Sequence, residues 1–314
     1  MPALVALQER VDRHWFGQPE HDEAQVRESF DRVAPLALRS RLWFDDGLLA
    51  AAAWWWREDE TTVLVDPRAD APAVYDDLLP WLADSGATDV EALRQDVVFL
   101  TVLQQHGWQP IGSQFELVRD TSPLPSPRWP DAVTTTGLGD HALAVYRVIY
   151  DEAGWAQIPG HGHRGAEEWH SLFLAGEDPG QQVLAWSGGR LVGVALGTTF
   201  SDGMGWVSQV AVTPDRQGQG LGSALLVEAL RRRLAVGARR LGLGVSAAND
   251  DALRLYQRLG FDVDREWVRH RLDPRRSPAS ARSGAGNQPA HDDAEEHERA
   301  AEDGLAEQRR AEDD

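Results

Sequence analysis

The sequence predicts an α/β protein, layered in the α+β manner, with two similar domains in tandem. Three observations lead to this prediction. Helix-like and strand-like segments alternate in the second half, a proline-rich stretch divides the 314 residues, and the first half repeats the pattern of the second. Segments that alternate in this way pack as helices against a sheet. We expect each domain to be a mixed, mostly antiparallel sheet flanked by helices.

Composition sets the domain boundaries. Residues 121–131 read TSPLPSPRWPD, and four prolines within that length exclude a helix interior or a central strand. This linker separates a first domain at 1–120 from a second at 132–274. Residues 275–314 are rich first in Ser, Ala, Gly and Pro and then in Asp and Glu. Such a tail has too few large apolar residues to offset the entropy lost on ordering, so we expect disorder there.

The second half shows the clearest periodicities. Apolar residues at helical spacing predict helices, and alternating runs bounded by Gly, Pro or Ser predict strands. The expected helices are 140–153, 167–175, 221–236 and 249–259, and the expected strands are 182–186, 190–199, 206–212, 240–245 and 261–272.

The first half repeats this pattern. Residues 42–56 resemble the hairpin of the second half, 61–66 form a strand that ends in Asp-Pro, and 72–83 form a helix. The segment 96–108, which ends LQQHGW, aligns with 249–261, which ends YQRLGF, at a constant offset of 153. A repeat of this length predicts a duplicated domain.

Three consecutive tryptophans in the first half allow two interpretations. Trp54, Trp55 and Trp56 lie at the end of the predicted hairpin. They would line an aromatic pocket for an amine, or they would belong to a strand packed on both faces. We favour the strand, because side chains of consecutive strand residues alternate between the two faces, and large apolar residues on both faces are typical of a strand packed on both sides.

Charge and residue usage limit the partners. The formal charge of −19 repels nucleic acid and favours a cationic amine over an anionic substrate. Without cysteine there is no disulfide and no thiolate nucleophile, and all 31 basic residues are arginine. The chain shows no apolar run of membrane-spanning length and no secretory leader. We expect a cytoplasmic protein without a membrane partner.

A glycine-rich loop carries the main chemical signal. Residues 209–226 read QVAVTPDRQGQGLGSALL, so a strand leads into Gly218, Gly220 and Gly222 and then into an apolar-faced helix. Glycines let the backbone approach a ligand closely, and a helix N-terminus offers free N–H groups and partial positive charge. The pattern predicts a pyrophosphate site rather than a turn that binds nothing.

Two common phosphate-binding motifs do not fit this loop. A P-loop needs a lysine after its last glycine, and the chain contains no lysine. A dinucleotide fingerprint has the spacing G-x-G-x-x-G directly after a strand, whereas here the spacing is G-x-G-x-G and four residues intervene.

The spacing Gln217-x-x-Gly220-x-Gly222 resembles the acetyl-CoA loop of the GNAT superfamily of N-acetyltransferases. Downstream, NDDA at 249–252 and LYQRLGF at 255–261 are similar to the second cofactor segment of that family. The resemblance covers about residues 133–273, and it implies two tandem GNAT-like domains with acetyl-CoA as cosubstrate and no metal. By position, the implied cofactor-binding residues are Val210, Ala211, Val212, Gln217, Gly218, Gln219, Gly220, Leu221, Gly222, Ser223, Asn249 and Tyr256.

The resemblance also implies roles for two side chains. Asn249 would bind the pantetheine arm, and Tyr256 would be the catalytic acid that protonates the leaving thiolate. A phenol with a pKa near ~10 suits this task, because it is protonated at neutral pH. The alternative is a core tyrosine with a structural role.

The general base departs from the family pattern. Many relatives have a Glu near the position of Trp206, and an indole cannot accept a proton. The remaining candidates are Asp202, Glu152, His161 and His163, and the sequence does not choose among them. The two histidines are spaced as metal ligands, but no third ligand follows at a fixed spacing, so we predict no metal site.

The first half lacks the corresponding chemistry. After Asp66-Pro67 it reads RADAPAVY without glycine, and the counterparts of Asn249 and Tyr256 are Asp96 and Leu103. We expect a degenerate copy that does not bind coenzyme A and that supports the second domain.

The predicted function is transfer of an acetyl group from acetyl-CoA to an amine of a small molecule or peptide, by direct attack in a ternary complex. Two alternatives stay open. One is a non-catalytic acyl-CoA-binding module. The other is an acetyltransferase similar to mycothiol synthase, against which stand the missing Glu and the lost glycine loop of the first half. A homodimer is compatible with the sequence.

Overall fold

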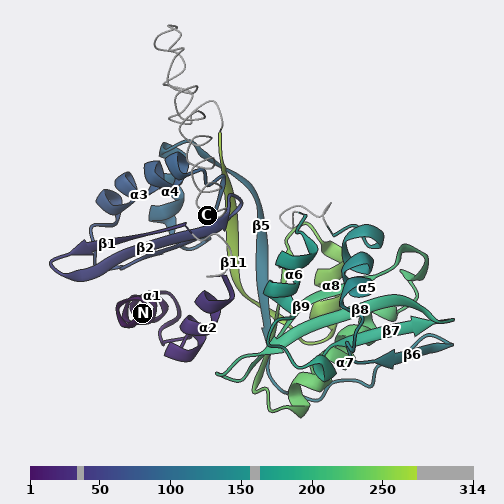
Figure 1. Cartoon of the computed structure of the whole chain (residues 1–314). Helices are drawn as coiled ribbons and strands as arrows, with labels where there is room; N and C mark the ends of the chain where they lie inside the picture. The colour runs from purple at the N-terminus through teal and green to yellow at the C-terminus, as the bar shows by residue number, and fades with distance from the viewer. Residues whose placement is uncertain (34–38, 156–162, 274–314) are drawn as a thin grey trace, which may run out of the picture. The chain divides into compact units, whose positions relative to one another are not determined.

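The structure is a computed structural model that describes residues 1–33, 39–155 and 163–273 (Figure 1). Two earlier predictions lie outside the described residues: the disordered tail at 275–314 and a role for His161. Residues Met1–Asp273 form one compact unit. None of the helices in these ranges is long and apolar enough to cross a membrane.

A small sheet and a large sheet form the frame of this unit. The small sheet is antiparallel with the order β1-β2-β3, and the large sheet has the order β4-β11-β5-β10-β9-β8-β7-β6. The strands are β1 (Arg39–Asp45), β2 (Leu48–Arg57), β3 (Glu60–Val65), β4 (Asp89–Leu93), β5 (Trp108–Arg119), β6 (Val133–Thr136), β7 (Val183–Ser187), β8 (Arg190–Thr199), β9 (Met204–Val212), β10 (Arg240–Ser246) and β11 (Asp262–Leu272).

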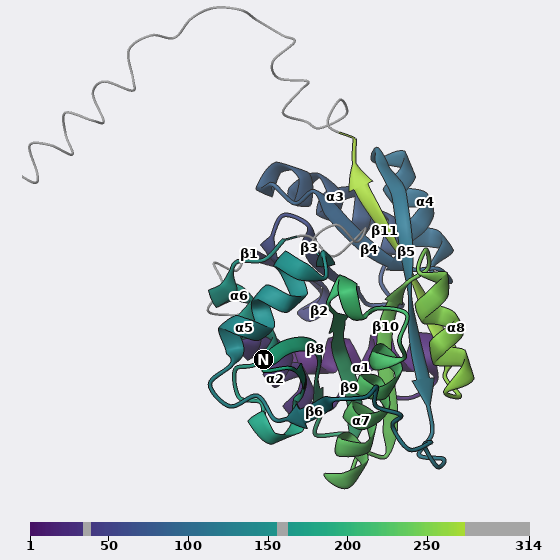
Figure 2. The same cartoon turned by 90° about the vertical axis from the view of Figure 1, so that its right-hand side faces the viewer.

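Helices cover both faces of the large sheet (Figure 2). On one face α7 and α8 pack over β8, β9 and β10, and on the other α5 and α6 pack over β7, β8 and β9. The helices are α1 (Pro2–Phe16), α2 (Glu23–Val33), α3 (Ala71–Ser85), α4 (Val97–Gln105), α5 (Ala142–Arg147), α6 (Ala166–Phe173), α7 (Leu221–Ala235) and α8 (Asp250–Arg258). This mixed α/β arrangement confirms the predicted fold class.

The repeat extends to single hydrogen bonds. Asp96 begins α4, and its side chain accepts a hydrogen bond from the Phe99 amide at 2.9 Å. Asn249 begins α8, and its Oδ1 accepts one from the Ala252 amide at 3.1 Å. Both the helix starts and the capped amides are separated by the predicted offset of 153. Asp and Asn are among the best residues for this capping position, so both copies keep the same local signal.

The two halves of the chain share their last strands. β5 from the first half lies between β10 and β11, and β11 in turn pairs with β4 and β5 (Figure 1). Each half therefore completes the sheet of the other. The division at 1–120 and 132–274 remains a prediction, since a continuous sheet crosses it.

β5 was not predicted from the sequence. It contains Pro110 and Gly112, which usually interrupt strands. The register against β11 shifts between the residues paired with Gly112 and Pro110, so an irregularity accommodates the proline. The helices α1 and α2 and the strands β4 and β6 were also not predicted.

β2 packs on both faces, as expected. Trp55 is buried with Ala51 and Ala53 under α3, whereas Trp54 points to the other side, toward α1. The side chain of Trp56 lies outside the described residues. One of the two described tryptophans therefore belongs to a core, and the other, Trp54, lines a cavity that is considered below.

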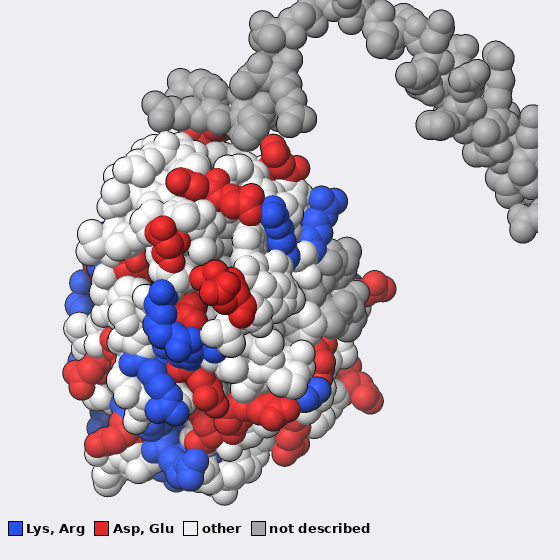
Figure 3. Space-filling view, turned by 90° about the vertical axis from the view of Figure 1, so that its left-hand side faces the viewer, with Lys and Arg blue, Asp and Glu red and all other residues white. Residues whose placement is uncertain are grey.

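The surface does not express the net charge uniformly. On the face shown in Figure 3, acidic side chains lie beside a band of basic ones. Some exposed charges of the molecule are paired, for example Arg190 with both Glu152 and Asp215. The negative charge therefore gives no single acidic face on this side of the molecule.

Candidate functional site

The two central strands of the large sheet separate partway along their length. Parallel pairing between β9 and β10 runs from Met204 and Arg240 to Val207 and Leu243 and then ends. A bulge in β9 follows, because Gly197 pairs with Val207 while the preceding Leu196 pairs with Gln209. Beyond it the strands enclose a cleft of about 90 Å³. The cleft is lined by Trp155, Val207, Ser208, Gln209, Val210, Leu243, Gly244, Val245, Ser246, Asn249 and Tyr256.

The separation leaves one edge of β9 available for a ligand. Past Val207, β9 is paired with β8 only. Backbone N–H and C=O groups in such a place need partners, and an extended ligand arm can supply them. Val210 lines the cleft, whereas Ala211 is buried on the α5 and α6 side and Val212 lies next to Gly222. Of these three predicted contacts, only Val210 is therefore among the residues that line the cleft.

The glycine loop follows β9 and ends at α7. Gly218 and Gly220 have positive φ angles of 72° and 83°, which favour glycine over other residues, and Gly220 begins the helix. Gln217 Nε2 donates to the carbonyl of Val212 at 3.0 Å, and Gln219 Nε2 donates to that of Asp215 at 2.9 Å. Both glutamine side chains thus brace the loop itself.

The loop can receive an anion. The first backbone bond of α7 runs from the Ala224 amide to the Gly220 carbonyl at 3.1 Å, so the amides of Leu221, Gly222 and Ser223 have no acceptor within the helix. A Cβ added at Gly218 or Gly220 would meet no protein atom within 4 Å. Free amides, open space and the positive end of a helix are together a site for phosphate groups.

Tyr256 lies on α8 and lines the cleft. Its ring packs edge-on against Phe261, with the ring centres 6.2 Å apart. Burial raises the pKa of the Tyr256 phenol to about 12, because the phenolate would lose solvation. The group is therefore a proton donor at neutral pH. Asn249 also lines the cleft, with its carbonyl oxygen engaged in capping α8.

The described candidates for a general base do not line this cleft. Asp202 accepts a hydrogen bond from the Met204 amide at 2.8 Å and lines a different cavity. Glu152 is paired with Arg190 at 2.8 Å. His163 lies 3.4 Å from the hydroxyl of Tyr146. Trp206, at the position where many relatives have Glu, packs against Gly242 on β10.

A polar group that the sequence analysis missed lies beside the cleft. Gln209 is buried, and its Oε1 accepts a hydrogen bond from Trp169 Nε1 at 2.9 Å. The Tyr150 hydroxyl also interacts with Gln209, and burial raises the pKa of Tyr150 to about 12. The signal in the sequence was a single glutamine inside an apolar strand, which indicates a buried polar contact. The three residues fix the wall of the cleft opposite α7 and α8.

The first half has a carboxylate just before its counterpart of the glycine loop. Asp66 follows β3 and is paired with Arg10 at 2.5 Å and with Arg68 at 2.9 Å. Burial alone would raise the pKa of Asp66, but hydrogen bonds from the two arginines lower it to about 2. The counterpart of Tyr256, Leu103, is fully buried in a core. A fixed negative charge and a missing phenol do not suit a coenzyme site.

Metal ligands do not cluster in the described residues. No group of three or more His, Cys, Asp or Glu side chains in these ranges is arranged to hold an ion.

Comparison with known proteins agrees with this geometry. Residues 146–261 match the model of the acetyltransferase (GNAT) family. A mycothiol acetyltransferase of Thermomonospora curvata is 33% identical over 149 residues, which cover 45% of this chain and 48% of that protein. The chain spans about half the length of the curated relatives it matches.

Two solved structures match over most of the chain. A GCN5-related N-acetyltransferase from Sphaerobacter thermophilus has a TM-score of 0.70 at 25% identity, over 86% of this chain and 91% of that one. A tandem GNAT protein from the clavulanic acid biosynthesis pathway has a TM-score of 0.62 at 14% identity, over 86% and 93%, which is a likeness of fold. The family model and the separated strands lead to one conclusion: residues 146–261 belong to the acetyltransferase (GNAT) family, and the fold over most of the chain is that of GNAT proteins.

Proposed function

We propose that the protein transfers an acetyl group from acetyl-CoA to an amine of a small molecule or peptide. The observation that carries the proposal is the cleft between β9 and β10, which has the glycine loop at the start of α7 beyond its open end and Tyr256 in its lining. The glycine loop supplies free amides for phosphates, and Tyr256 supplies a proton donor.

Each part of the site has a distinct task in this proposal. The amides of Leu221, Gly222 and Ser223 hold the pyrophosphate, and the positive helix end strengthens that contact. The unpaired edge of β9 near Val210 orients the pantetheine arm beside Asn249. The coenzyme supplies the activated acyl group. Tyr256 retains its proton until the carbon–sulfur bond breaks and then delivers it to the sulfur, so that the thiol leaves without charge.

The structure supports attack by an amine that arrives without its proton. Among the described residues, no carboxylate and no histidine lines the cleft. Trp206 does not accept protons, so we assign no side chain as general base. After the attack, the nitrogen would lose one proton to water, because the product amide carries one hydrogen fewer than the amine. The rate at low amine concentration should then increase with pH and become constant once the pH exceeds the pKa of the amine.

The relatives favour a small-molecule acceptor over a peptide. Several curated relatives that are 30% to 39% identical carry the name mycothiol acetyltransferase. An activity similar to theirs is the second candidate function. It would be recognised by acetylation of the amine precursor of mycothiol. A chain that binds acetyl-CoA but acetylates no amine would instead be a binding module.

Calorimetric titration of acetyl-CoA into the full chain tests the cofactor site. The Gly220→Arg variant places a bulky side chain in the open space before α7 and should abolish binding. Gly237→Arg is the matched control, because Gly237 also has a positive φ (97°) and open space but lies at the other end of α7. The backbone strain in Gly237→Arg is comparable to that in Gly220→Arg, and Gly237→Arg should bind acetyl-CoA as wild type does.

The outcomes separate the alternatives. Binding by wild type and Gly237→Arg, with none by Gly220→Arg, supports the proposed site. An amine screen for thiol release then distinguishes the transferase from the binding module. Absence of binding by wild type would end the transferase proposal, and equal loss in both variants would show that strain, not position, is responsible.

A further inference from the structure

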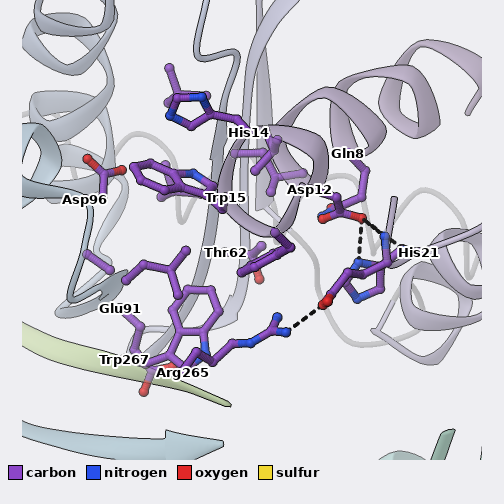
Figure 4. Close-up of a pocket in the computed structure, with 18 of the residues that line it drawn as sticks. Gln8, Asp12, His14, Trp15, His21, Thr62, Glu91, Asp96, Arg265 and Trp267 are labelled. Atoms are coloured by element: carbon purple, nitrogen blue, oxygen red, sulfur yellow. Dashed lines mark hydrogen bonds and ion pairs between the residues drawn. The ribbon is translucent and has the colours of Figure 1, made fainter. Parts of the chain in front are cut away.

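A second and larger cavity is lined mostly by residues of the first half of the chain and partly by residues of the second half, among them Asp202, Trp206 and Arg265. Its volume is about 700 Å³, which is within the range of ~300–1,000 Å³ typical of small-molecule sites. It lies where β3 and β4, which belong to different sheets, face one another beneath α1 (Figure 4). These strands correspond by repeat to β9 and β10, so the cavity is the first half's widened version of the cleft described above.

The lining combines carboxylates with tryptophan rings. Eight carboxylates and only two arginines line the cavity. Four tryptophans also line it, namely Trp15, Trp54, Trp206 and Trp267. Indole faces attract organic cations, and the carboxylates strengthen that preference. The lining therefore suits a positively charged ligand with a ring-shaped body.

The arginines do not balance the carboxylates on the β11 side. Arg265 is shared by Glu20 at 2.6 Å, Asp264 at 2.5 Å and Glu116 at 3.2 Å. One guanidinium group thus faces three carboxylates. Burial raises the pKa of Glu116 even though Arg265 opposes the shift. A further cation would be stabilised in this cavity.

Asp96 is a partly buried carboxylate of this lining. One of its oxygens caps α4, and the hydroxyl of Tyr75 faces it. In the described ranges no arginine forms an ion pair with Asp96. Burial raises its pKa, and the hydrogen bond from the Phe99 amide, the charge of His14 and the hydrogen bond with Tyr75 oppose that shift. Figure 4 shows the carboxylate directed toward the ring of Trp15, inside the cavity. A buried carboxylate without a cation is costly, and a bound ammonium group removes that cost.

We propose that this cavity binds a small organic cation, an amine with a ring-shaped body, with its ammonium group against Asp96 and its ring against Trp15. The site is separate from the coenzyme cleft. The proposal concerns binding alone and does not depend on the acyl transfer proposed above.

Coenzyme A does not suit this cavity. Its phosphates would face Asp66, which lies just before the first half's counterpart of the glycine loop and is held there by Arg10 and Arg68. The negative charges of the phosphates and of the Asp66 carboxylate would repel one another. Retention of the coenzyme by the first half is therefore an outcome that would contradict the proposal.

Titration of the full chain with tyramine and with glucosamine tests the site, by calorimetry and by tryptophan fluorescence. Each amine is compared with its neutral counterpart, tyrosol or glucose. We expect at least one amine to bind, with its neutral counterpart weaker by about tenfold or more, because a charged hydrogen bond is lost.

Asp96→Asn locates the binding. Asparagine caps a helix as well as aspartate does, so the start of α4 is preserved while the charge is removed. The variant should bind the amine at least about tenfold more weakly than wild type does. Asp178→Asn is the matched control: Asp178 also caps a helical turn, through the Gly180 amide at 2.8 Å, but lies outside the cavity lining. It should bind as wild type does.

Three results would overturn the proposal. The first is that neither amine binds at concentrations up to about 10 mM, which is well above the ~1 mM dissociation constant of an ordinary weak site. The second is equal binding by Asp96→Asn and wild type, and the third is acetyl-CoA that still binds Gly220→Arg and displaces the amine. Failure of the transferase proposal is distinguishable. In that case wild type binds no acetyl-CoA, whereas amine binding and its dependence on Asp96 persist.

Discussion

The indole ring of Trp206 covers Gly242 on the neighbouring strand. The two residues are paired in register, and a Cβ at Gly242 would lie 2.7 Å from Cε3 and 2.8 Å from Cζ3 of the ring. The next pair along, Val207 and Leu243, is the last before β9 and β10 separate. Trp206 therefore packs one residue before the point at which the two strands separate.

Gly242→Ala should destabilise the protein by about 1 to 3 kcal/mol, because the added methyl group forces the ring of Trp206 aside. Gly244→Ala is the matched control. It lies two residues further on the same strand, and its Cβ would be 3.7 Å from the ring, an ordinary contact. We expect a change of at most about 0.5 kcal/mol there. Urea unfolding measures both, and equal effects would mean that the ring does not hold this position.

Tyr256→Phe should lower kcat by about 10²-fold, the lower end of the range for general acids, since a thiolate is only a moderately strong base. Acetyl-CoA affinity should not change, because the ring and its contact with Phe261 are retained. Steady-state kinetics with coenzyme titration as the control measures the two effects separately. An unchanged kcat would identify Tyr256 as a structural residue of the core.

The same substitution should alter stability in alkaline solution. The folded protein keeps the Tyr256 phenol protonated to about pH 12, whereas the unfolded phenol ionises near ~10. Between these values the unfolded state loses a proton that the folded state retains, so stability decreases as pH rises. By about pH 11 the wild type should lose about 1.4 kcal/mol relative to Tyr256→Phe.

Urea unfolding of both proteins at about pH 8 and pH 11 provides the measurement. Tyr75 and Tyr150 also have raised pKa values, but they are present in both proteins and cancel in the difference. A difference that does not change with pH would mean that the phenol is not buried as described.

Local signals in the sequence predicted the second half closely. The helix expected at 221–236 is observed as α7, and the strand expected at 190–199 is β8 with the same bounds. Gly220 ends the glycine loop and begins α7, so the loop and the helix start are adjacent in the chain and can be recognised together. The glycine loop and α8 could be found for the same reason.

Contacts between distant segments could not be predicted in this way. β5 has its partners 122 to 164 residues further along, and its own Pro110 and Gly112 indicate a loop. The large cavity brings Asp96 against Trp15, which lies on a helix that the sequence did not indicate. Nothing near either residue in the chain marks it as part of a site. Such sites depend on tertiary packing, which outweighs local propensity.

The shared sheet predicts that the first half does not fold alone. In a fragment of residues 1–120, β5 loses β10 and β11, and β4 loses β11. Long strands with both edges unpaired associate with other chains, so the fragment should aggregate and show no cooperative unfolding. A full chain cut at a protease site placed within 121–131 should behave differently. Its two pieces should elute together on gel filtration, because the strands of each half remain paired with those of the other. Pieces that separate and each unfold cooperatively would restore the division at 120 as a boundary between independent domains.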